Sequence, residues 1–137
     1  MALTGGCYCG AIRYEAGGEP TMRVQCQCRE CQHVSGGAPN LAMGMQADAF
    51  RWTQGEPKSF SRDDLETPRV RDFCPNCGTH ILTHSPPRPG LVMLKIGTLD
   101  DPNAFIGPDV VIYTRDCQDW HYLPDGVPAH DGMPGHS

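Results

Sequence analysis

The chain has 137 residues, of which 39% are hydrophobic, and it contains 16 Gly and 13 Pro. This length and composition predict a single turn-rich domain over residues 1–137, with a modest core. The formal charge is −5, from 16 acidic and 11 basic residues without a run of Lys or Arg, which argues against a nucleic-acid partner. No apolar run approaches the roughly 20 residues needed to cross a bilayer, so membrane insertion is excluded.

Seven of the eight cysteines lie in three tight clusters, which are Cys7 and Cys9; Cys26, Cys28 and Cys31; and Cys74 and Cys77. Disulfides need an oxidising compartment, which is normally reached through a signal peptide. The N-terminal residues show no basic segment followed by an apolar one, which predicts a cytoplasmic protein with reduced thiols. In that setting, thiols spaced by two and three residues are typical of metal ligands.

The first cysteine pair lies next to a predicted strand. Apolar and polar residues alternate over 11–16, as in a half-buried strand, and a turn is expected at 17–20. If the strand extends back to Cys7, the side chains of Cys7 and Cys9 point to the same face and form a chelating pair.

The three-cysteine cluster lies at the end of a second predicted strand, over 22–28. A turn or short helix is expected at 29–34, and the Gly- and Pro-containing residues 35–39 terminate it. One buried strand face is then predicted from alternate apolar positions, at Leu41, Met43 and Met45.

Three aromatic residues, Phe50, Trp52 and Phe60, lie around a predicted turn at 54–58 between two short strands. We expect these side chains to pack in the core. Residues 61–68 are polar and lack periodicity, which predicts a surface loop.

The third cysteine cluster has the form of a zinc knuckle. A strand predicted over 70–73 leads into Cys74-Pro75-Asn76-Cys77-Gly78, in which Pro restricts the turn and Gly lets backbone amides point at the thiolates. Beyond it we expect strands starting at Ile81 and over 91–96 and 109–114, with a rigid loop at 86–90. The tail from Trp120 is rich in turns, so the core is expected within residues 3–128 and a frayed end over 129–137.

The seven clustered thiols divide into four plus three. The Cys-x-Cys and Cys-x-x-Cys pairs can close one four-thiolate site, which leaves the triplet with a metal of its own. A second partition, in which two triplet thiols join the knuckle, stays open, and a histidine can also complete a site. The candidate histidines are His33, His80, His84 and His121. Cys117 has no near partner and is expected to be a small buried hydrophobe.

A metal bound only by Cys26, Cys28 and Cys31 keeps an open fourth position, where a substrate atom can bind. Three thiolates on a zinc dication leave one net negative charge, so the ion is a weak Lewis acid that suits a substrate thiol held as thiolate. A sulfur-bearing substrate is therefore expected. Arginines that can offset the negative charge lie beside the clusters, at Arg23, Arg29 and Arg71.

Five motifs distributed over nearly the whole chain form one pattern. They are Gly6-Cys7-x-Cys9-Gly10; Cys26-x-Cys28-x-x-Cys31 followed by Ser35-Gly36; Asp48-Ala49-Phe50; Arg71-x-Phe73-Cys74-x-x-Cys77-Gly78; and Asp125-Gly126-Val127-Pro128 after Trp120. The pattern resembles the glutathione-dependent formaldehyde-activating enzyme family, whose relatives include centromere protein V. Two positions differ from the family pattern, Gln27 and Pro39-Asn40, and we expect them to shape the pocket wall.

The resemblance implies a mainly β fold, a small zinc-stapled domain of short antiparallel sheets of the β-tent type. It also implies two Zn²⁺ ions per chain. The structural zinc would be held by Cys7, Cys9, Cys74 and Cys77, and the second zinc by Cys26, Cys28 and Cys31. The implied activity is the condensation of glutathione with formaldehyde to S-hydroxymethylglutathione, which is classed as a carbon-sulfur lyase reaction.

The leading hypothesis is a zinc-dependent enzyme of this lyase type that acts on glutathione or a related small thiol. Its catalytic residues would be Cys26, Cys28 and Cys31, around the open zinc position. The alternative is a non-catalytic, zinc-stapled binding module, in which both metals only stabilise a small core. A third hypothesis is redox sensing by the triplet of thiols.

Overall fold

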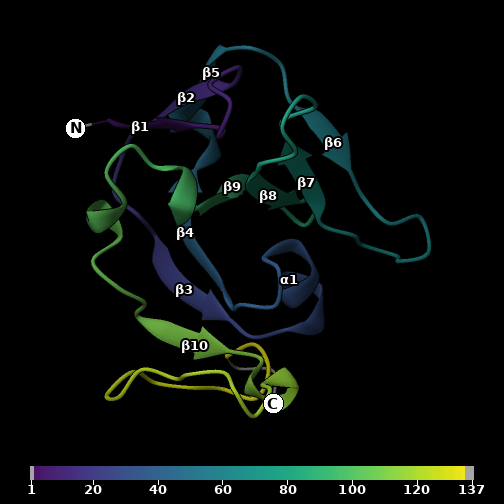
Figure 1. The fold of residues 1–137 in the computed structure, drawn as a ribbon, viewed down its shortest axis with the longest axis vertical. Helices are drawn as coiled ribbons and strands as arrows, with labels where there is room; N and C mark the ends of the chain where they lie inside the picture. The colour runs from purple at the N-terminus through teal and green to yellow at the C-terminus, as the bar shows by residue number, and fades with distance from the viewer. Residues whose placement is uncertain (1, 135–137) are drawn as a thin grey trace.

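The computed structural model describes residues 2–134 and consists mainly of β-strands in two sheets (Figure 1). The smaller sheet has the order β1-β2-β5 and is antiparallel throughout. Its strands are β1 (Leu3–Gly6), β2 (Arg13–Ala16) and β5 (Phe50–Gln54). This confirms the predicted mainly β fold of short antiparallel sheets.

The larger sheet has seven strands in the order β10-β3-β4-β9-β8-β7-β6. Neighbouring strands are antiparallel except β10 and β3, which pair in parallel. Its strands are β3 (Met22–Cys26), β4 (Asn40–Gln46), β6 (Lys58–Phe60), β7 (Val70–Phe73), β8 (His80–Ser85), β9 (Arg88–Lys95) and β10 (Val110–Ile112).

Helical structure is short and lies between the strands. The α-helix α1 (Arg29–Val34) follows β3, where a turn or short helix was expected. The remaining helical turns are of the 3₁₀ type, at Ala47–Ala49, Ile96–Thr98, Pro102–Phe105 and Thr114–Asp116. Within residues 2–134, no helix is long and apolar enough to span a membrane.

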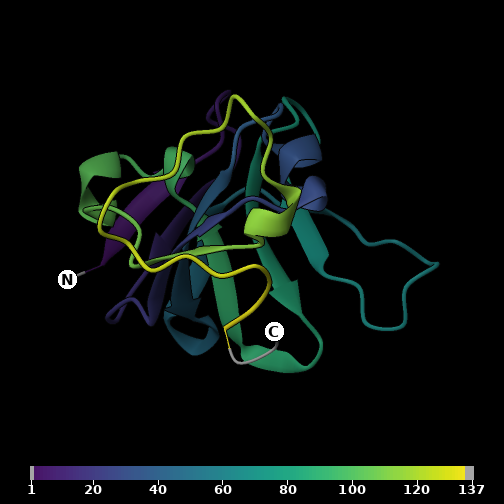
Figure 2. The ribbon, with the colours of Figure 1, turned by 90° about the horizontal axis from the view of Figure 1, so that it is seen from below.

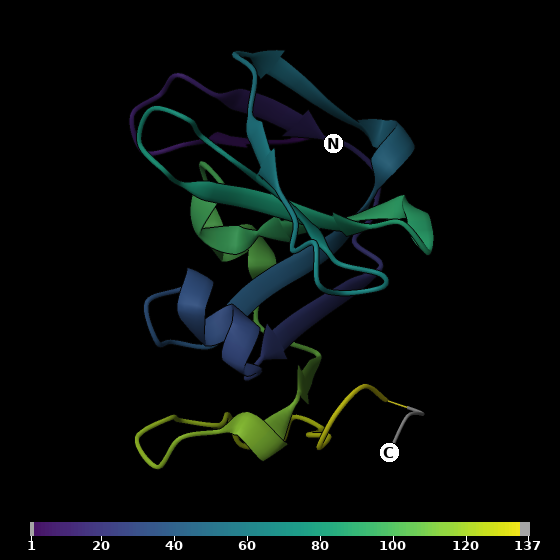
Figure 3. The ribbon, with the colours of Figure 1, turned by 90° about the vertical axis from the view of Figure 1, so that its right-hand side faces the viewer.

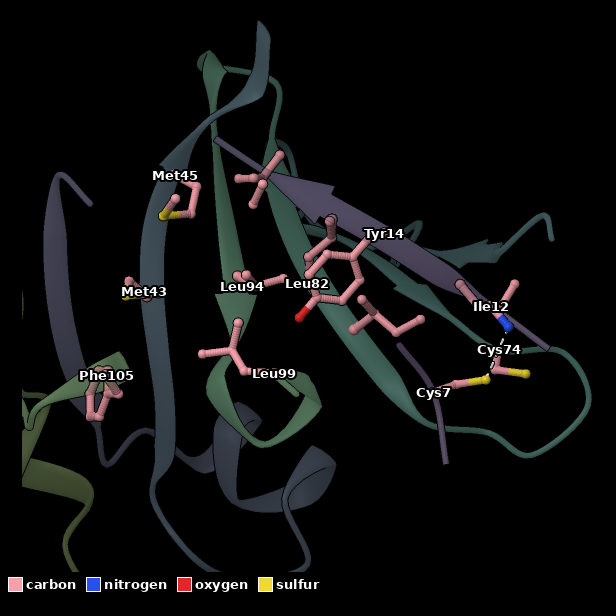
Figure 4. Close-up of a cluster of buried hydrophobic side chains, with 13 residues drawn as sticks. Cys7, Ile12, Tyr14, Met43, Met45, Cys74, Leu82, Leu94, Leu99 and Phe105 are labelled. Atoms are coloured by element: carbon pink, nitrogen blue, oxygen red, sulfur yellow. Dashed lines mark hydrogen bonds between the residues drawn. The ribbon is translucent and has the colours of Figure 1, made fainter. Parts of the chain in front are cut away.

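The main core lies between the three-stranded sheet and the centre of the larger sheet (Figure 4). Tyr14 from β2 packs there with Met43 and Met45 from β4, and all three side chains are almost completely buried. The predicted buried face of β4 is therefore confirmed at these two methionines. Cys7 and Cys74 lie at one end of the same core, so the core positions part of the first cysteine cluster.

The three-stranded sheet lies at one end of the molecule, and β10 with the C-terminal segment lies at the other (Figure 3). A second apolar cluster forms near this other end, separate from the main core. It contains Val24, Cys26, Cys31 and Ile112, with Met22, Cys28, Met93, Val110, Tyr113 and Met133 packed against it. Three of the predicted metal ligands therefore belong to an apolar environment.

The prediction that the strand extends back to Cys7 is wrong. β1 ends at Gly6 and β2 begins at Arg13, while the chain from Cys7 to Gly10 makes a turn in which the Gly10 amide donates to the Cys7 carbonyl at 3.2 Å. Gly10 has φ of +84°, which an L-residue adopts only with strain. The turn, rather than the period of a strand, brings the first two thiols together.

The expected pairing of strands around residues 54–58 also differs. β5 pairs with β2 in the smaller sheet, whereas β6 pairs with β7 and forms the edge of the larger sheet. Phe50 and Trp52 pack against the main core as expected. The prediction is wrong for Phe60, which is 57% exposed because it belongs to the edge strand.

Two further boundaries differ from the prediction. The second strand ends at Cys26 rather than Cys28, because α1 begins soon afterwards. The rigid loop at 86–90 is shorter, since β9 already begins at Arg88. The loop over 61–68 is exposed along most of its length, as predicted, and projects from the body of the molecule (Figure 2).

The expected frayed tail is not observed where the structure describes it. The Pro128 carbonyl accepts a hydrogen bond from the Val111 amide, and the His130 amide donates to the Val111 carbonyl, both at 2.9 Å. Ala129 forms an isolated parallel bridge with Val111. Residues 129–134 are therefore attached to β10, and residues 135–137, which belong to the same prediction, lie outside the described residues.

Candidate functional site

Four cysteine sulfurs gather where two turns from different sheets meet. Cys7 and Cys9 lie in the turn between β1 and β2, and Cys74 and Cys77 lie in the turn between β7 and β8. The four sulfur atoms are all within 4.8 Å of one another. The measured separations of 3.6 Å for Cys7–Cys9 and 3.8 Å for Cys9–Cys74 fit a tetrahedral zinc site, in which Zn–S bonds of about 2.3 Å place sulfurs about 3.8 Å apart.

Hydrogen-bond donors surround these sulfurs. The Ile12 amide donates to Cys7 Sγ at 3.2 Å (Figure 4), and the amides of Asn76 and Cys77 both donate to Cys74 Sγ at 3.4 Å. The Thr79 hydroxyl, 3.2 Å from Cys77 Sγ, lowers the pKa of that thiol to about 5. Donors of this kind stabilise thiolates, which are the metal-binding form of cysteine.

The other three clustered cysteines meet at the end of β3. Cys26 is the last residue of that strand, and Cys28 caps the N-terminus of α1, where its sulfur accepts a hydrogen bond from the Cys31 amide at 3.3 Å. A cap and a residue three positions later lie close together at the start of a helix. The three sulfur atoms are therefore within 4.8 Å of one another.

Hydrogen bonding within this three-cysteine cluster favours the thiolate form of Cys28. Hydrogen bonds from the side chains of Cys26, the larger effect, and Cys31 lower the pKa of Cys28 to about 2. The pKa of Cys26 is raised, because its thiol is hydrogen bonded to Cys28. A cluster that already stabilises a thiolate is suited to a cationic metal.

The three-cysteine cluster opens into a cleft of about 660 Å³. This volume lies within the range of ligand pockets in proteins. Five cationic side chains and two acidic ones line it, namely Arg29, Arg69, Arg71, Arg88 and Lys95, with Glu30 and Asp116. In contrast, none of the four cysteines of the first cluster lines this cleft in the part of the chain that the structure describes.

Arg71 and Lys95 are the most deeply buried cations of the cleft, at 6% and 9% exposure. Arg71 forms an ion pair with Glu30 at 2.5 Å. Lys95 Nζ has no hydrogen-bond partner among the described residues. Burial lowers the pKa of Lys95 to about 8, although the charges of Cys31 and Cys26 act in the opposite direction. A buried cation without a partner is costly to stability, which favours a functional role.

Sequence reasoning missed Lys95, although a signal was present. The residue ends the most continuous apolar run of the chain, Leu91-Val92-Met93-Leu94, which becomes β9. Side chains at alternate positions of a strand share a face, so Lys95 lies on the same face as Met93 and Leu91, which line the cleft. A lysine continuing a buried strand face is a candidate buried charge.

The histidines proposed as extra ligands lie elsewhere, since neither sulfur group includes one within residues 2–134. His33 Nδ1 is 2.8 Å from the Arg29 carbonyl, and His80 stacks on Phe73. His84 lies in the cleft lining, and its Nε2 is 3.6 Å from Asp72. His121 Nε2 is 2.7 Å from the Gly37 carbonyl, at the surface segment that follows Cys117.

Three further expectations change. Gln27 does not line the cleft, because its side chain is fully buried and bonds to Gln25 at 2.9 Å and to Cys117 at 3.8 Å. Asn40 does line it. Cys117 is only partly buried rather than a core hydrophobe. Of the arginines expected near the thiols, Arg29 and Arg71 reach the cleft, whereas Arg23 lies 3.9 Å from Asp109.

Comparisons with known proteins concern the sequence and the fold. A protein of Halomonas elongata, provisionally named a glutathione-dependent formaldehyde-activating enzyme, is 31% identical over 98 residues, which is 67% of this chain and 62% of the relative. The match thus covers less than two thirds of that relative. A crystal structure of a Rhodobacter sphaeroides protein shares the fold, with a TM-score of 0.57 at 18% identity, over 71% of this chain and 87% of the other.

The family comparison is broader, because it covers most of the chain. A sequence model of the family described as "Glutathione-dependent formaldehyde-activating enzyme" matches residues 2–116. That range contains both cysteine clusters and every strand described above. The chain therefore belongs to the glutathione-dependent formaldehyde-activating enzyme family.

Proposed function

We propose that this protein is a zinc-dependent enzyme of the carbon-sulfur lyase type that handles glutathione or a related small thiol. The leading reaction is the formation of S-hydroxymethylglutathione from glutathione and formaldehyde. One observation carries the proposal: the cluster with three sulfurs lines a ligand-sized cleft, whereas the cluster with four sulfurs, among residues 2–134, lies outside that cleft. Catalytic zinc sites keep an open position, and structural sites are closed.

The donor sets fit zinc in both places. Cys7, Cys9, Cys74 and Cys77 would hold a structural ion, and Cys26, Cys28 and Cys31 would hold the second, which makes two Zn²⁺ per chain. At the second site, the metal would supply one chemical effect, because a thiol bound at the open position loses its proton more readily. All eight cysteines are free thiols, which suits a reducing compartment such as the cytoplasm.

The residues of the chain would bind and orient the reactants. Glutathione carries two carboxylates, and the excess of cationic side chains in the cleft suits them. In the reaction, a carbon-sulfur bond forms, the π bond of the carbonyl breaks, and the thiol proton ends on the former carbonyl oxygen. Lys95, with its free Nζ, is placed to donate a hydrogen bond to an oxygen that gains negative charge in this step.

The test uses cobalt in place of zinc, since thiolate-to-cobalt absorption reports each added sulfur ligand. Glutathione at millimolar concentration should change the spectrum of the parent protein and of Cys117→Ser, a matched control outside both clusters. Cys31→Ser should show no such change and should lower the zinc content from two per chain to one.

Catalysis is measured separately, as the rate of S-hydroxymethylglutathione formation above the uncatalysed background, by exchange NMR. The parent should raise this rate and Cys31→Ser should not. If glutathione leaves the cobalt spectrum of the parent unchanged, the proposed function is wrong, and a non-catalytic zinc-stapled module explains the fold better.

A further inference from the structure

One wall of the cleft is apolar and rich in methionine. The wall consists of Met22, Val24, Met93, Val110, Ile112 and Met133. These side chains pack around Cys26 and Cys31 in the second apolar cluster. Methionine side chains are flexible and polarisable, so they adapt to ligands of varied shape. We call these six residues the methionine wall.

Sheet order separates the methionine wall from the charged part of the cleft. β10, β3 and β4 are neighbours at one edge of the larger sheet, and β10 and β3 carry wall residues such as Val24 and Ile112. Arg71 lies on β7, toward the other edge. β9 lies between and carries both Met93 and Lys95. The cleft therefore has an apolar side at β3 and β10 and a side with Arg71 and Lys95, which we call the cationic side. Among the other cations, Arg29 lies near β10, where its amide donates to Asp116.

Part of the methionine wall comes from outside the region matched by the family. The family model ends at residue 116, whereas Met133 belongs to the segment that is hydrogen bonded to β10. The match to the family therefore does not cover the whole cleft. Substrate preference is a property that Met133, as the wall residue outside the matched region, can alter without a change in the thiols.

Formaldehyde and glutathione leave the methionine wall without a partner. Formaldehyde has one carbon, and glutathione is a polar tripeptide whose carboxylates match the cationic side. The wall residues are buried or half-buried and line the cleft, and an apolar cleft wall next to a reactive centre favours a substrate that buries apolar surface there.

We propose that the aldehyde partner of this site carries an apolar alkyl or aryl group, which the methionine wall binds while glutathione occupies the cationic side. The inference rests on the proposed function. The sulfur of glutathione bonds to the aldehyde carbon, the carbonyl π bond breaks, and the thiol proton ends on oxygen, so no oxidant or reductant is needed. The product is the hemithioacetal of glutathione with the apolar aldehyde.

Stable S-alkylglutathiones mimic this adduct, because they hold the same tripeptide and an alkyl group on sulfur. We would measure the binding of S-methyl-, S-butyl- and S-hexylglutathione to the zinc-loaded protein by isothermal titration calorimetry. Each fully buried methylene should tighten binding about fourfold. Burial of about half of the added chain gives S-hexylglutathione an advantage of about thirtyfold over S-methylglutathione.

Met93→Gln, which keeps the length of the side chain but makes it polar, should reduce this ratio at least about fivefold. Met133→Gln tests the same wall from a segment outside the sheet, in case the first variant folds poorly. Leu65→Gln is the matched control, since Leu65 lies in the exposed loop before β7 and is absent from the cleft lining. It should keep the parent ratio.

Equal affinities for the S-methyl and S-hexyl compounds would overturn the apolar subsite. An unchanged ratio in both Met93→Gln and Met133→Gln would also overturn it, because the alkyl chain would then bind elsewhere. Failure of the proposed function looks different. In that case free glutathione leaves the cobalt spectrum unchanged, whatever the ratio between the alkyl compounds.

Discussion

The two cysteine clusters should differ in what they contribute to stability, and we expect Cys77→Ser to lower the free energy of unfolding more than Cys31→Ser. The first cluster joins a turn of the smaller sheet to a turn of the larger sheet, and Cys9 and Cys74 are 65 residues apart. Closing a loop of about 65 residues removes on the order of 4 kcal/mol of chain entropy from the unfolded state. The three-cysteine cluster closes a loop of about 5 residues, for which the same relation gives roughly 2 kcal/mol. The expected difference is therefore about 2 kcal/mol.

Urea unfolding in excess zinc, followed by circular dichroism, measures this difference. Cys117→Ser serves as the control for the loss of a thiol outside both clusters, and we expect it to stay within about 1 kcal/mol of the parent. Zinc content should be determined for each variant, so that loss of a ligand is distinguished from loss of the fold. If Cys31→Ser and Cys77→Ser lose the same stability, the three-cysteine cluster is also a structural staple. The reasoning that assigns it a catalytic role would then fail.

Three further predictions concern the core and the cleft. Burial raises the pKa of Tyr14 from 10.0 to about 12, so the folded protein favours the neutral phenol. The free energy of unfolding therefore keeps its full value below pH 10 and falls by about 3 kcal/mol as the pH rises through 12. Urea unfolding at pH 9 to 12 should show this loss in the parent but not in Tyr14→Phe, and parallel curves would contradict it. Gly5→Ala places a methyl group against the Thr98 carbonyl and the Tyr14 hydroxyl, so it should lower the free energy of unfolding by about 1–3 kcal/mol. In the control Gly97→Ala the new methyl group meets no atom within 4 Å, so the stability should be nearly unchanged. Similar losses of stability in the two variants would refute the packing argument. Lys95→Met should weaken the binding of 3-mercaptopropionate, an anionic thiol, about tenfold, and should change the binding of neutral 2-mercaptoethanol little. Both affinities are measured by the absorption of the cobalt-substituted protein. Equal changes in the two affinities would show that Lys95 does not select anions.

The grouping of the thiols could be predicted because the spacing of cysteines restricts which sulfurs can meet. Cys26, Cys28 and Cys31 lie close in sequence, and α1 begins where its cap, Cys28, meets Cys31. The alternative partition, in which two of these thiols join the knuckle, is not the grouping found among residues 2–134. The meeting of the Cys7 turn with the Cys74 turn required contact between two sheets, which local patterns do not encode. The resemblance to a known family supplied that long-range information.

The lining of the cleft could not be predicted from local patterns. Phe60 has an apolar aromatic side chain of the kind usually found in a core, yet it is exposed because β6 is an edge strand. Lys95 has a charged side chain of the kind usually found at the surface, yet it is buried because β9 lies near the centre of the sheet. In both cases strand order decides the environment, and strand order depends on pairing between distant segments.

The attachment of residues 128–134 to β10 and the residues after it has a consequence for how this protein can be changed. The segment contributes Met133 and Pro134 to the cleft but contains none of the clustered cysteines, and it is held mainly by backbone hydrogen bonds to residues 111–115. Backbone hydrogen bonds tolerate many side chains. Replacing this segment with another sequence would therefore change one side of the cleft while leaving both clusters of sulfur atoms in place. Natural variation of the segment can change the cleft in the same way.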